Sequence, residues 1–227
     1  MKRFVAIILT SFILILTACS GTQSSQVSSL TSSVPLIGNV DVYDAETLMN
    51  AVRSSDATGV NIKADMTIGL SSIEEFEKKG FVMVIDAGVT VTMQDNFMPV
   101  YFGSDSVNGI INNGTLVLTK TFEFAMLTFE NNGTIRIMNG GMLAPGYSTI
   151  INNGEVIIDE GGELRIERET TFNNAATVTN NGLLKISSDG GIFNNLATGT
   201  IANNKTIACV GTYTNAGQFI GEGEPLQ

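Results

Sequence analysis

The sequence predicts an all-β fold in which short parallel strands coil into a solenoid, and two observations support this prediction. Paired asparagines, the last reduced to Asn-Ala, recur at steps of 19, 21, 21, 21 and 21 residues, beginning at Asn112, Asn131, Asn152, Asn173, Asn194 and Asn215. Between the pairs, apolar and polar residues alternate as they do in strands with one buried face. A period of about 21 residues indicates a small unit stacked on copies of itself, with about seven or eight units in the chain.

Each repeat unit contains two columns of turn residues. The first column is the asparagine pair. The second column comprises Asn139–Gly141, Glu160–Gly162, Asn180–Gly182 and Asn203–Lys205. Asn and Gly suit such corners because both accept left-handed backbone angles. Strands follow the corners, and their alternate apolar positions, such as Leu116 and Leu118, are expected to point inward. The pattern leaves two or three strands per unit as alternatives.

The region before the repeats predicts a cap for the first turn of the coil. Asp44 is a suitable N-cap for a helix that ends at Ser54, in which Ala45, Leu48 and Val52 share an apolar face. Such a cap is needed because the first turn would otherwise expose its apolar interior and an unpaired strand edge.

A second short helix is expected within the early strands. The segment Ser72–Glu75 matches a capping box, which predicts a helix over Ile73–Lys79 that forms a lateral insertion. We therefore assign residues 40–57 to an N-terminal capping region and residues 58–227 to the β-helix.

The Asn/Gly-rich repeats over roughly residues 40–220 resemble the right-handed parallel β-helices of bacterial adhesins, autotransporter passenger domains and polymorphic surface proteins. The resemblance implies a single-stranded right-handed parallel β-helix with a short N-terminal capping helix. It also implies a role in adhesion, recognition or assembly at the cell surface. A left-handed solenoid is the structural alternative, but the six-residue period of that class does not occur here.

The first residues of the chain indicate export and membrane anchoring. Two basic residues precede the short apolar run Phe4–Leu16, which is typical of a secretory signal. The segment Leu16–Cys19 (LTAC) resembles the lipobox of bacterial lipoproteins. That resemblance implies removal of residues 1–18 and acylation of Cys19, with the Ser-rich residues 19–39 as a flexible tether. The protein would then lie in the cell envelope, in the outer membrane of a Gram-negative host or otherwise on the outer face of the plasma membrane.

Composition excludes several classes of partner and site. The chain has 12 basic and 22 acidic residues, a net charge of −10, which argues against nucleic acid and against adhesion to anionic lipid. It has no His, which excludes Ser-His-Asp and Cys-His nucleophilic sites. We expect no metal or other cofactor, because the calcium-binding nonapeptide and a cysteine cluster are both missing. With Cys19 acylated, Cys209 has no partner for an internal disulfide and is expected to be a small inward-facing residue.

One charged surface cluster is the strongest candidate for chemistry. Glu163, Arg165 and Glu167 alternate with inward-facing residues and therefore share an outer strand face, and the repeat places Lys185 beside Arg165. A polysaccharide lyase could draw a base from Arg165 or Lys185 and calcium ligands from the two glutamates. Alternating charges on an exposed strand are also what solubility and cross-strand pairing produce, and we favour that interpretation.

Aromatic residues are the remaining candidates for a ligand surface. Phe172 and Phe193 occupy the same repeat position and are expected to stack in the core. Tyr147 lies in an irregular stretch and is the aromatic residue that we expect to be exposed.

These observations favour a non-enzymatic, lipid-anchored envelope protein that presents a surface for adhesion, recognition or assembly. A carbohydrate-active or glycan-binding β-helix protein is the alternative. We also consider self-association through the C-terminal rung, which shows no capping helix and carries only charge and Pro225 for protection.

Overall fold

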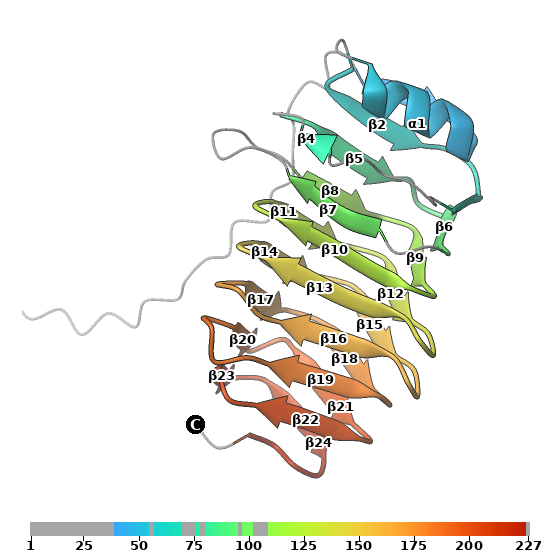
Figure 1. Cartoon of the computed structure of the whole chain (residues 1–227). Helices are drawn as coiled ribbons and strands as arrows, with labels where there is room; N and C mark the ends of the chain where they lie inside the picture. Colours follow the sequence, from blue (N-terminus) through green and yellow to red (C-terminus); the bar gives the residue numbers. More distant parts are fainter. Residues whose placement is uncertain are drawn as a thin grey trace, which may run out of the picture. The chain divides into compact units, whose positions relative to one another are not determined.

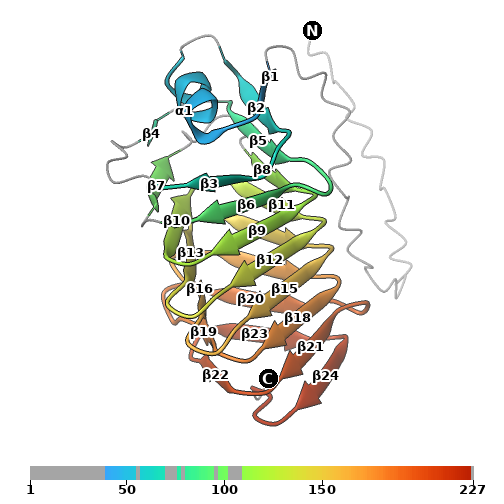
Figure 2. The same ribbon diagram turned by 90° about the vertical axis from the view of Figure 1, so that its right-hand side faces the viewer.

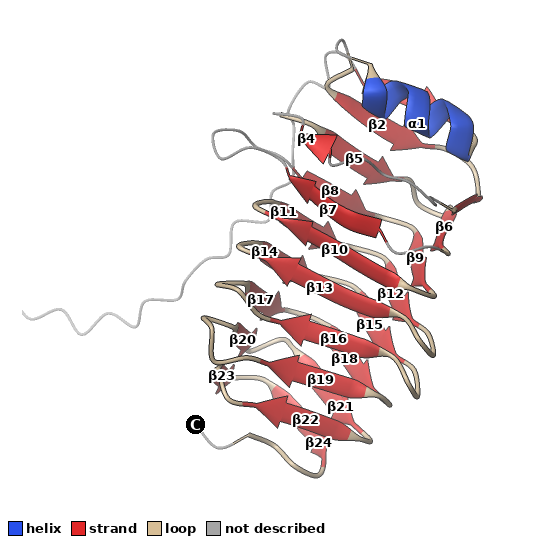
Figure 3. Ribbon diagram, viewed as in Figure 1, coloured by secondary structure: helices blue, strands red, loops and turns tan. Residues whose placement is uncertain are grey.

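A computed structural model describes residues 39–54, 57–69, 76–77, 80–94, 97–101 and 109–225. These residues form a parallel β-solenoid of about seven turns with one short helix, as predicted (Figures 1 and 3). The coil is right-handed, which is the sense that nearly all parallel strand crossovers take. The predicted signal segment, Cys19 and most of the Ser-rich tether lie outside the described residues.

Three parallel sheets make up the walls of the coil. Sheet A has nine strands, in spatial order β1 (Asn39–Val42), β2 (Gly59–Ile62), β5 (Val82–Ile85), β8 (Gly109–Asn112), β11 (Thr128–Asn131), β14 (Thr149–Asn152), β17 (Thr171–Asn174), β20 (Ile192–Asn195) and β23 (Thr212–Asn215).

Sheet B, seen face-on in Figure 2, has eight strands, which are β3 (Met66–Ile68), β6 (Thr90–Met93), β9 (Thr115–Leu118), β12 (Thr134–Ile137), β15 (Glu155–Ile158), β18 (Thr177–Asn180), β21 (Thr200–Asn203) and β24 (Gln218–Gly221).

Sheet C has seven strands, which are β4 (Phe76–Glu77), β7 (Phe97–Tyr101), β10 (Thr121–Ala125), β13 (Met142–Gly146), β16 (Glu163–Ile166), β19 (Leu183–Ile186) and β22 (Thr206–Cys209). Each complete turn runs from sheet A through sheet B to sheet C, so the unit has three strands and three corners. The sequence revealed two of these corners.

The interior of the coil is filled by the alternate apolar residues of all three sheets. Leu116 and Leu118 are at most 1% exposed, as the alternation predicts. Phe172 stacks on Phe193 with ring centroids 4.9 Å apart and an interplanar angle of 8°. Tyr213 continues this stack, with its ring centroid 6.1 Å from that of Phe193. The expected stacking of the two phenylalanines is therefore confirmed.

Buried asparagines form a ladder at the corner between sheets A and B. In each step a side-chain Nδ2 donates to the Oδ1 of the next turn at 2.7 Å, along Asn112, Asn131, Asn152, Asn174, Asn195 and Asn215. The ladder corrects the alignment of the sequence repeats, because Asn174 and not Asn173 pairs with Asn152. Asn173 faces outward on its strand, and the one-residue shift is taken up by the longer corner before β17.

Glycines of the Asn-Asn-Gly corners have a different role from the one predicted. Gly114, Gly133 and Gly154 are absent from the left-handed region. A Cβ on Gly133 would lie 2.0 Å from the Gly114 carbonyl oxygen, and one on Gly154 would lie 2.1 Å from the Gly133 oxygen. These glycines are required by close approach of consecutive turns. In the second corner the prediction is confirmed for Gly140 and Gly161, which both have φ of 78°, but not for Gly182.

The predicted N-terminal cap is present as α1 (Ala45–Arg53). Asp44 is its N-cap, and its carboxylate accepts a hydrogen bond from the Thr47 backbone N–H at 2.7 Å. Leu48 and Ala51 are buried, so the apolar face packs on the first turn of the coil.

The prediction of a second helix is wrong for the two residues of that segment that the structure describes. Residues 76–77, within the expected helix Ile73–Lys79, form strand β4, which pairs with β7 in sheet C. The capping-box segment Ser72–Glu75 lies outside the described residues. Strand pairing with the next turn outweighs a local helix signal here.

The last strands of each sheet, β22 to β24, pair on one side only within the described residues. Cys209 continues the inward column of Ile166 and Ile186 as predicted, but it is only partly buried because no described turn follows it. Burial raises the pKa of its thiol. Glu224 accepts hydrogen bonds from the Tyr213 hydroxyl and from Asn215 Nδ2, which holds the following segment against this turn.

Candidate functional site on sheet C

The outer face of sheet C brings together the five surface residues that the sequence singled out. Glu163 and Arg165 lie on β16, and Lys185 lies on β19. Tyr147 and Glu167 directly follow β13 and β16 at the corner that leads to sheet A. This face is the front of the coil in Figure 1.

Glu163 and Arg165 form a closed pair two residues apart on one strand. Arg165 Nε and Nη2 donate to the two carboxylate oxygens of Glu163 at 2.7 and 3.1 Å. This hydrogen bonding raises the pKa of Arg165 against the opposing effect of partial burial. Lys185 pairs in register with Arg165, as predicted, and makes no ion pair with any residue that the structure describes.

Arg168 joins two carboxylates and was missed by the sequence analysis. Its Nη2 lies 2.9 Å from Glu167 Oε1, and its Nη1 lies 2.7 Å from Glu123 Oε1, two turns back along the coil. The side chain reaches that far because it crosses Gly146, where a Cβ would lie 3.6 Å from the Arg168 Cβ. The hydrogen bond to Glu167 is the main cause that raises the pKa of Arg168. The sequence held one signal for this contact, which is that the turn between those of Glu123 and Arg168 carries the small residue Gly146.

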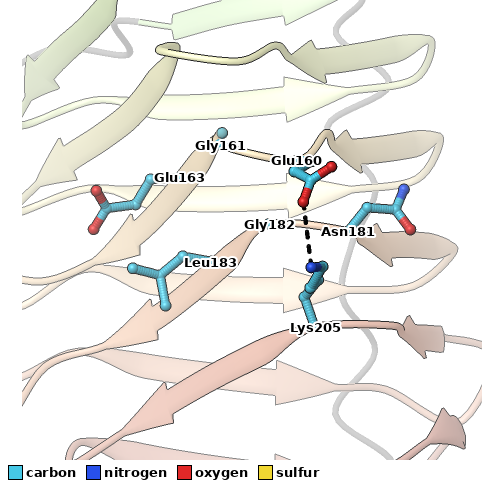
Figure 4. Close-up of a pocket in the computed structure, with 8 residues that line it drawn as sticks. Glu160, Gly161, Glu163, Asn181, Gly182, Leu183 and Lys205 are labelled. Atoms are coloured by element: carbon cyan, nitrogen blue, oxygen red, sulfur yellow. Dashed lines mark hydrogen bonds and ion pairs between the residues drawn. The ribbon is translucent and has the colours of Figure 1, made fainter.

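A shallow groove borders the other edge of sheet C, where sheet B leads into it (Figure 4). It has a volume of about 370 Å³ and is lined by Glu160, Gly161, Gly162, Glu163, Asn181, Gly182, Leu183 and Lys205. Lys205 Nζ lies 3.3 Å from Glu160 Oε1 across the short corner between them. Both side chains are more than half exposed, so this contact is weak in water.

The carboxylates that a lyase mechanism would need are ion-paired with arginines. Glu163 and Glu167 are each held by an arginine, and Asp159, which directly follows β15, is held in the same way by Arg136 at 2.8 Å. Arg165 is kept protonated by its partner, which makes it unsuitable as a base. Among the described residues, no group of three or more His, Cys, Asp or Glu side chains is placed to hold a metal ion.

Tyr147 is exposed, whereas Phe172, Phe193 and four further aromatic residues of the coil are buried. Tyr147 is 52% exposed, as expected. The buried ones, at 5% exposure or less, are Phe122, Phe124, Phe129, Phe172, Phe193 and Tyr213.

The edge between sheets C and A carries unusual backbone angles. The four described non-glycine residues with left-handed φ all lie there, at 60° in Met126, 50° in Tyr147, 49° in Arg168 and 55° in Glu169. The left-handed conformation costs roughly 1–2 kcal/mol for a residue with a Cβ. In the next turn Gly190, with φ of 92°, occupies this corner beneath Glu169, so glycine is compatible with the position.

No family model, curated protein or solved structure matches this chain. Within the part that the structure describes, no helix is long and apolar enough to cross a membrane. Function is therefore inferred from the geometry of sheet C and from the N-terminal sequence.

Proposed function

We propose that this chain is a lipid-anchored protein of the bacterial cell envelope whose solenoid acts by binding and not by catalysis. The observation that carries the proposal is the pairing on the outer face of sheet C. The carboxylates of Glu123, Glu163 and Glu167 form ion pairs with arginines. The face therefore offers an ordered pattern of charges and hydrogen-bonding groups, in which these carboxylates are not free to act as an acid or a base. Parallel strands on both sides hold this pattern rigid, which suits recognition because little ordering remains to be done on binding.

The N-terminal sequence supports the anchor. A short apolar run that ends at Leu16–Cys19 resembles the signal of bacterial lipoproteins. Each buried methylene of an acyl chain adds about 0.8 kcal/mol of membrane affinity, so two or three chains would hold the protein durably.

Palmitate labelling and membrane fractionation of cells test the anchor. We expect the wild-type protein to take up an alkyne-tagged palmitate and to fractionate with membranes. Cys19→Ala should lose both properties, whereas Cys209→Ala, which removes the other cysteine, should keep them. A Cys19→Ala protein that still carries label would contradict the lipoprotein assignment.

Incubation of the purified full-length protein with a panel of envelope and plant polysaccharides tests the non-catalytic role. We expect no new reducing ends and no unsaturated sugar products. Product formation that disappears in Lys185→Ala, the variant of the one unpaired amine in the predicted cluster, would establish the carbohydrate-active alternative.

A further inference from the structure

Met126, Tyr147 and Arg168, which we call the ridge, lie along the edge between sheets C and A. They occupy consecutive corners, where β10, β13 and β16 lead into β11, β14 and β17 (Figure 1). Backbone hydrogen bonds join these corners, from Met126 N to Gly146 O at 3.1 Å and from Tyr147 N to Arg168 O at 2.6 Å. Met126 and Tyr147 therefore hold equivalent positions about 4.8 Å apart, the spacing of neighbouring strands, and the next equivalent residue is Glu169, whose N–H donates to Asp189 O. Arg168 directly precedes Glu169, and its side chain lies against Gly146 and reaches Glu123.

Local stability does not explain the choice of Met126 and Tyr147, whereas Arg168 makes ion pairs with Glu123 and Glu167. All three adopt left-handed backbone angles that glycine would adopt without strain, and Gly190 does so at the position equivalent to Met126 and Tyr147. The side chains gain little burial in return, because Met126 is 43% exposed, Tyr147 is 52% exposed and the Arg168 side chain is 42% exposed. Strained backbone that persists with exposed side chains is typical of functional sites.

The composition of the ridge is that of a protein interface. Tyrosine, methionine and arginine are enriched in the buried centres of protein–protein contacts, and tyrosine and arginine dominate the residues that contribute most to affinity. A convex ridge of this kind fits a cleft on the partner. A glycan would be expected to lie on a flat or concave aromatic platform, and only one aromatic side chain is present on this ridge.

Charge around the ridge indicates what the partner carries. Glu123, Glu167 and Glu169 flank it, against the single guanidinium of Arg168. The surroundings are therefore acidic, as is the whole chain at a net charge of −10. Complementarity favours a partner with lysine or arginine on the rim of its cleft.

We propose that this ridge is the docking site for a partner protein that offers an apolar cleft with a basic rim. The proposal rests on the binding role proposed above and assigns that role to Met126, Tyr147 and Arg168. Tyr147 is the central anchor, Met126 extends the apolar contact by one turn, and Arg168, held by its two glutamates, is oriented without further loss of side-chain freedom.

Site-specific cross-linking on living cells tests the proposal with the full-length anchored protein. A photoreactive benzoylphenylalanine replaces Tyr147 in one strain and Tyr43 in another. Tyr43 is a matched control because it is also exposed, at 61%, and lies next to the N-cap of α1, far along the coil from the ridge. We expect a discrete protein adduct from position 147 and none from position 43.

Affinity measurements with the purified adduct partner then decide the outcome. We expect Tyr147→Asn to weaken binding at least tenfold and Tyr43→Asn to leave it unchanged. Asparagine accepts the left-handed conformation, so the melting temperature of Tyr147→Asn should equal or exceed that of the wild type. Binding should also weaken as salt rises, because the charges are exposed.

Three results would overturn the proposal. These are an adduct at position 147 no stronger than at position 43, an affinity that Tyr147→Asn leaves intact, and a melting temperature that falls by several degrees in Tyr147→Asn. Palmitate label that persists in Cys19→Ala, or turnover of a polysaccharide, would instead contradict the proposed function, and neither result depends on Tyr147.

Discussion

At the residue scale, the buried asparagine ladder shows how a polar side chain can hold consecutive turns together. Each Nδ2 donates toward the C-terminal turn, and backbone carbonyls fix that direction, as in the bond from Asn152 Nδ2 to Thr177 O at 3.1 Å. The amide dipoles therefore align along the coil and end at the Glu224 carboxylate. The outer asparagines bond in the opposite direction, for example from Asn153 Nδ2 to Asn132 Oδ1.

Asn152→Ala should lower the free energy of unfolding by about 2–4 kcal/mol, because it leaves the buried Asn174 Oδ1 without its donor and breaks the ladder in the middle. Asn153→Ala removes an exposed side chain next to it and should change the free energy by no more than about 0.5 kcal/mol. Urea denaturation followed by circular dichroism measures both. Equal losses in the two variants would show that the buried ladder has no special role.

At the element scale, the corners decide how closely turns can stack. The Asn-Asn-Gly corner places each glycine against a carbonyl of the preceding turn, so its missing Cβ is a condition for the strand spacing on both sides. The corner between sheets C and A is more permissive. It ranges from the two residues after β13 to the longer connection after β19, and it can therefore carry side chains chosen for another purpose.

Gly154→Ala should cost about 3 kcal/mol in unfolding free energy, since its Cβ would lie 2.1 Å from a backbone oxygen that cannot move alone. Gly146→Ala is the matched control, because its nearest contacts are side-chain atoms of Arg168 at 3.6 Å, and it should cost less than about 1 kcal/mol. Thermal and urea denaturation of the two variants provide the comparison. A fully stable Gly154→Ala protein would mean that the corner rearranges.

At the scale of the whole coil, stability is spread along one dimension. Each turn contacts only its neighbours, so the inner turns are held on two sides and the turn of β22 to β24 on one side within the described residues. That turn also exposes Val210 and Ile220, at 71% and 50%. The opposite end is covered by α1, which buries Leu48 and Ala51.

Amide hydrogen exchange measured by mass spectrometry should therefore show a gradient. We expect peptides from β22 to β24 to exchange at least tenfold faster than peptides from β11 to β16, because strands bonded on one side open first. Uniform protection along the coil would contradict this expectation. It would show that the coil opens as a single cooperative unit.

The sequence alone was enough to group Glu163, Arg165, Glu167 and Lys185. Alternation along a strand shows which residues share a face, and the repeat period shows which residues are neighbours in adjacent turns. The same reasoning missed Arg168, since its partner Glu123 lies two turns away and contact depends on Gly146 between them. It also missed Met126, because nothing in the local sequence shows that a corner is left-handed.

The sequence by itself determined the solenoid, its period, the inward columns and the capping helix, because each depends on a local alternation or on a repeat of residue types. Only the tertiary structure decided that Asn174 and not Asn173 joins the ladder, that Gly133 is needed for close approach, and that strained residues line one edge. Those features depend on the register between turns, and that register is set by corner lengths and contacts with chain about 20 residues away.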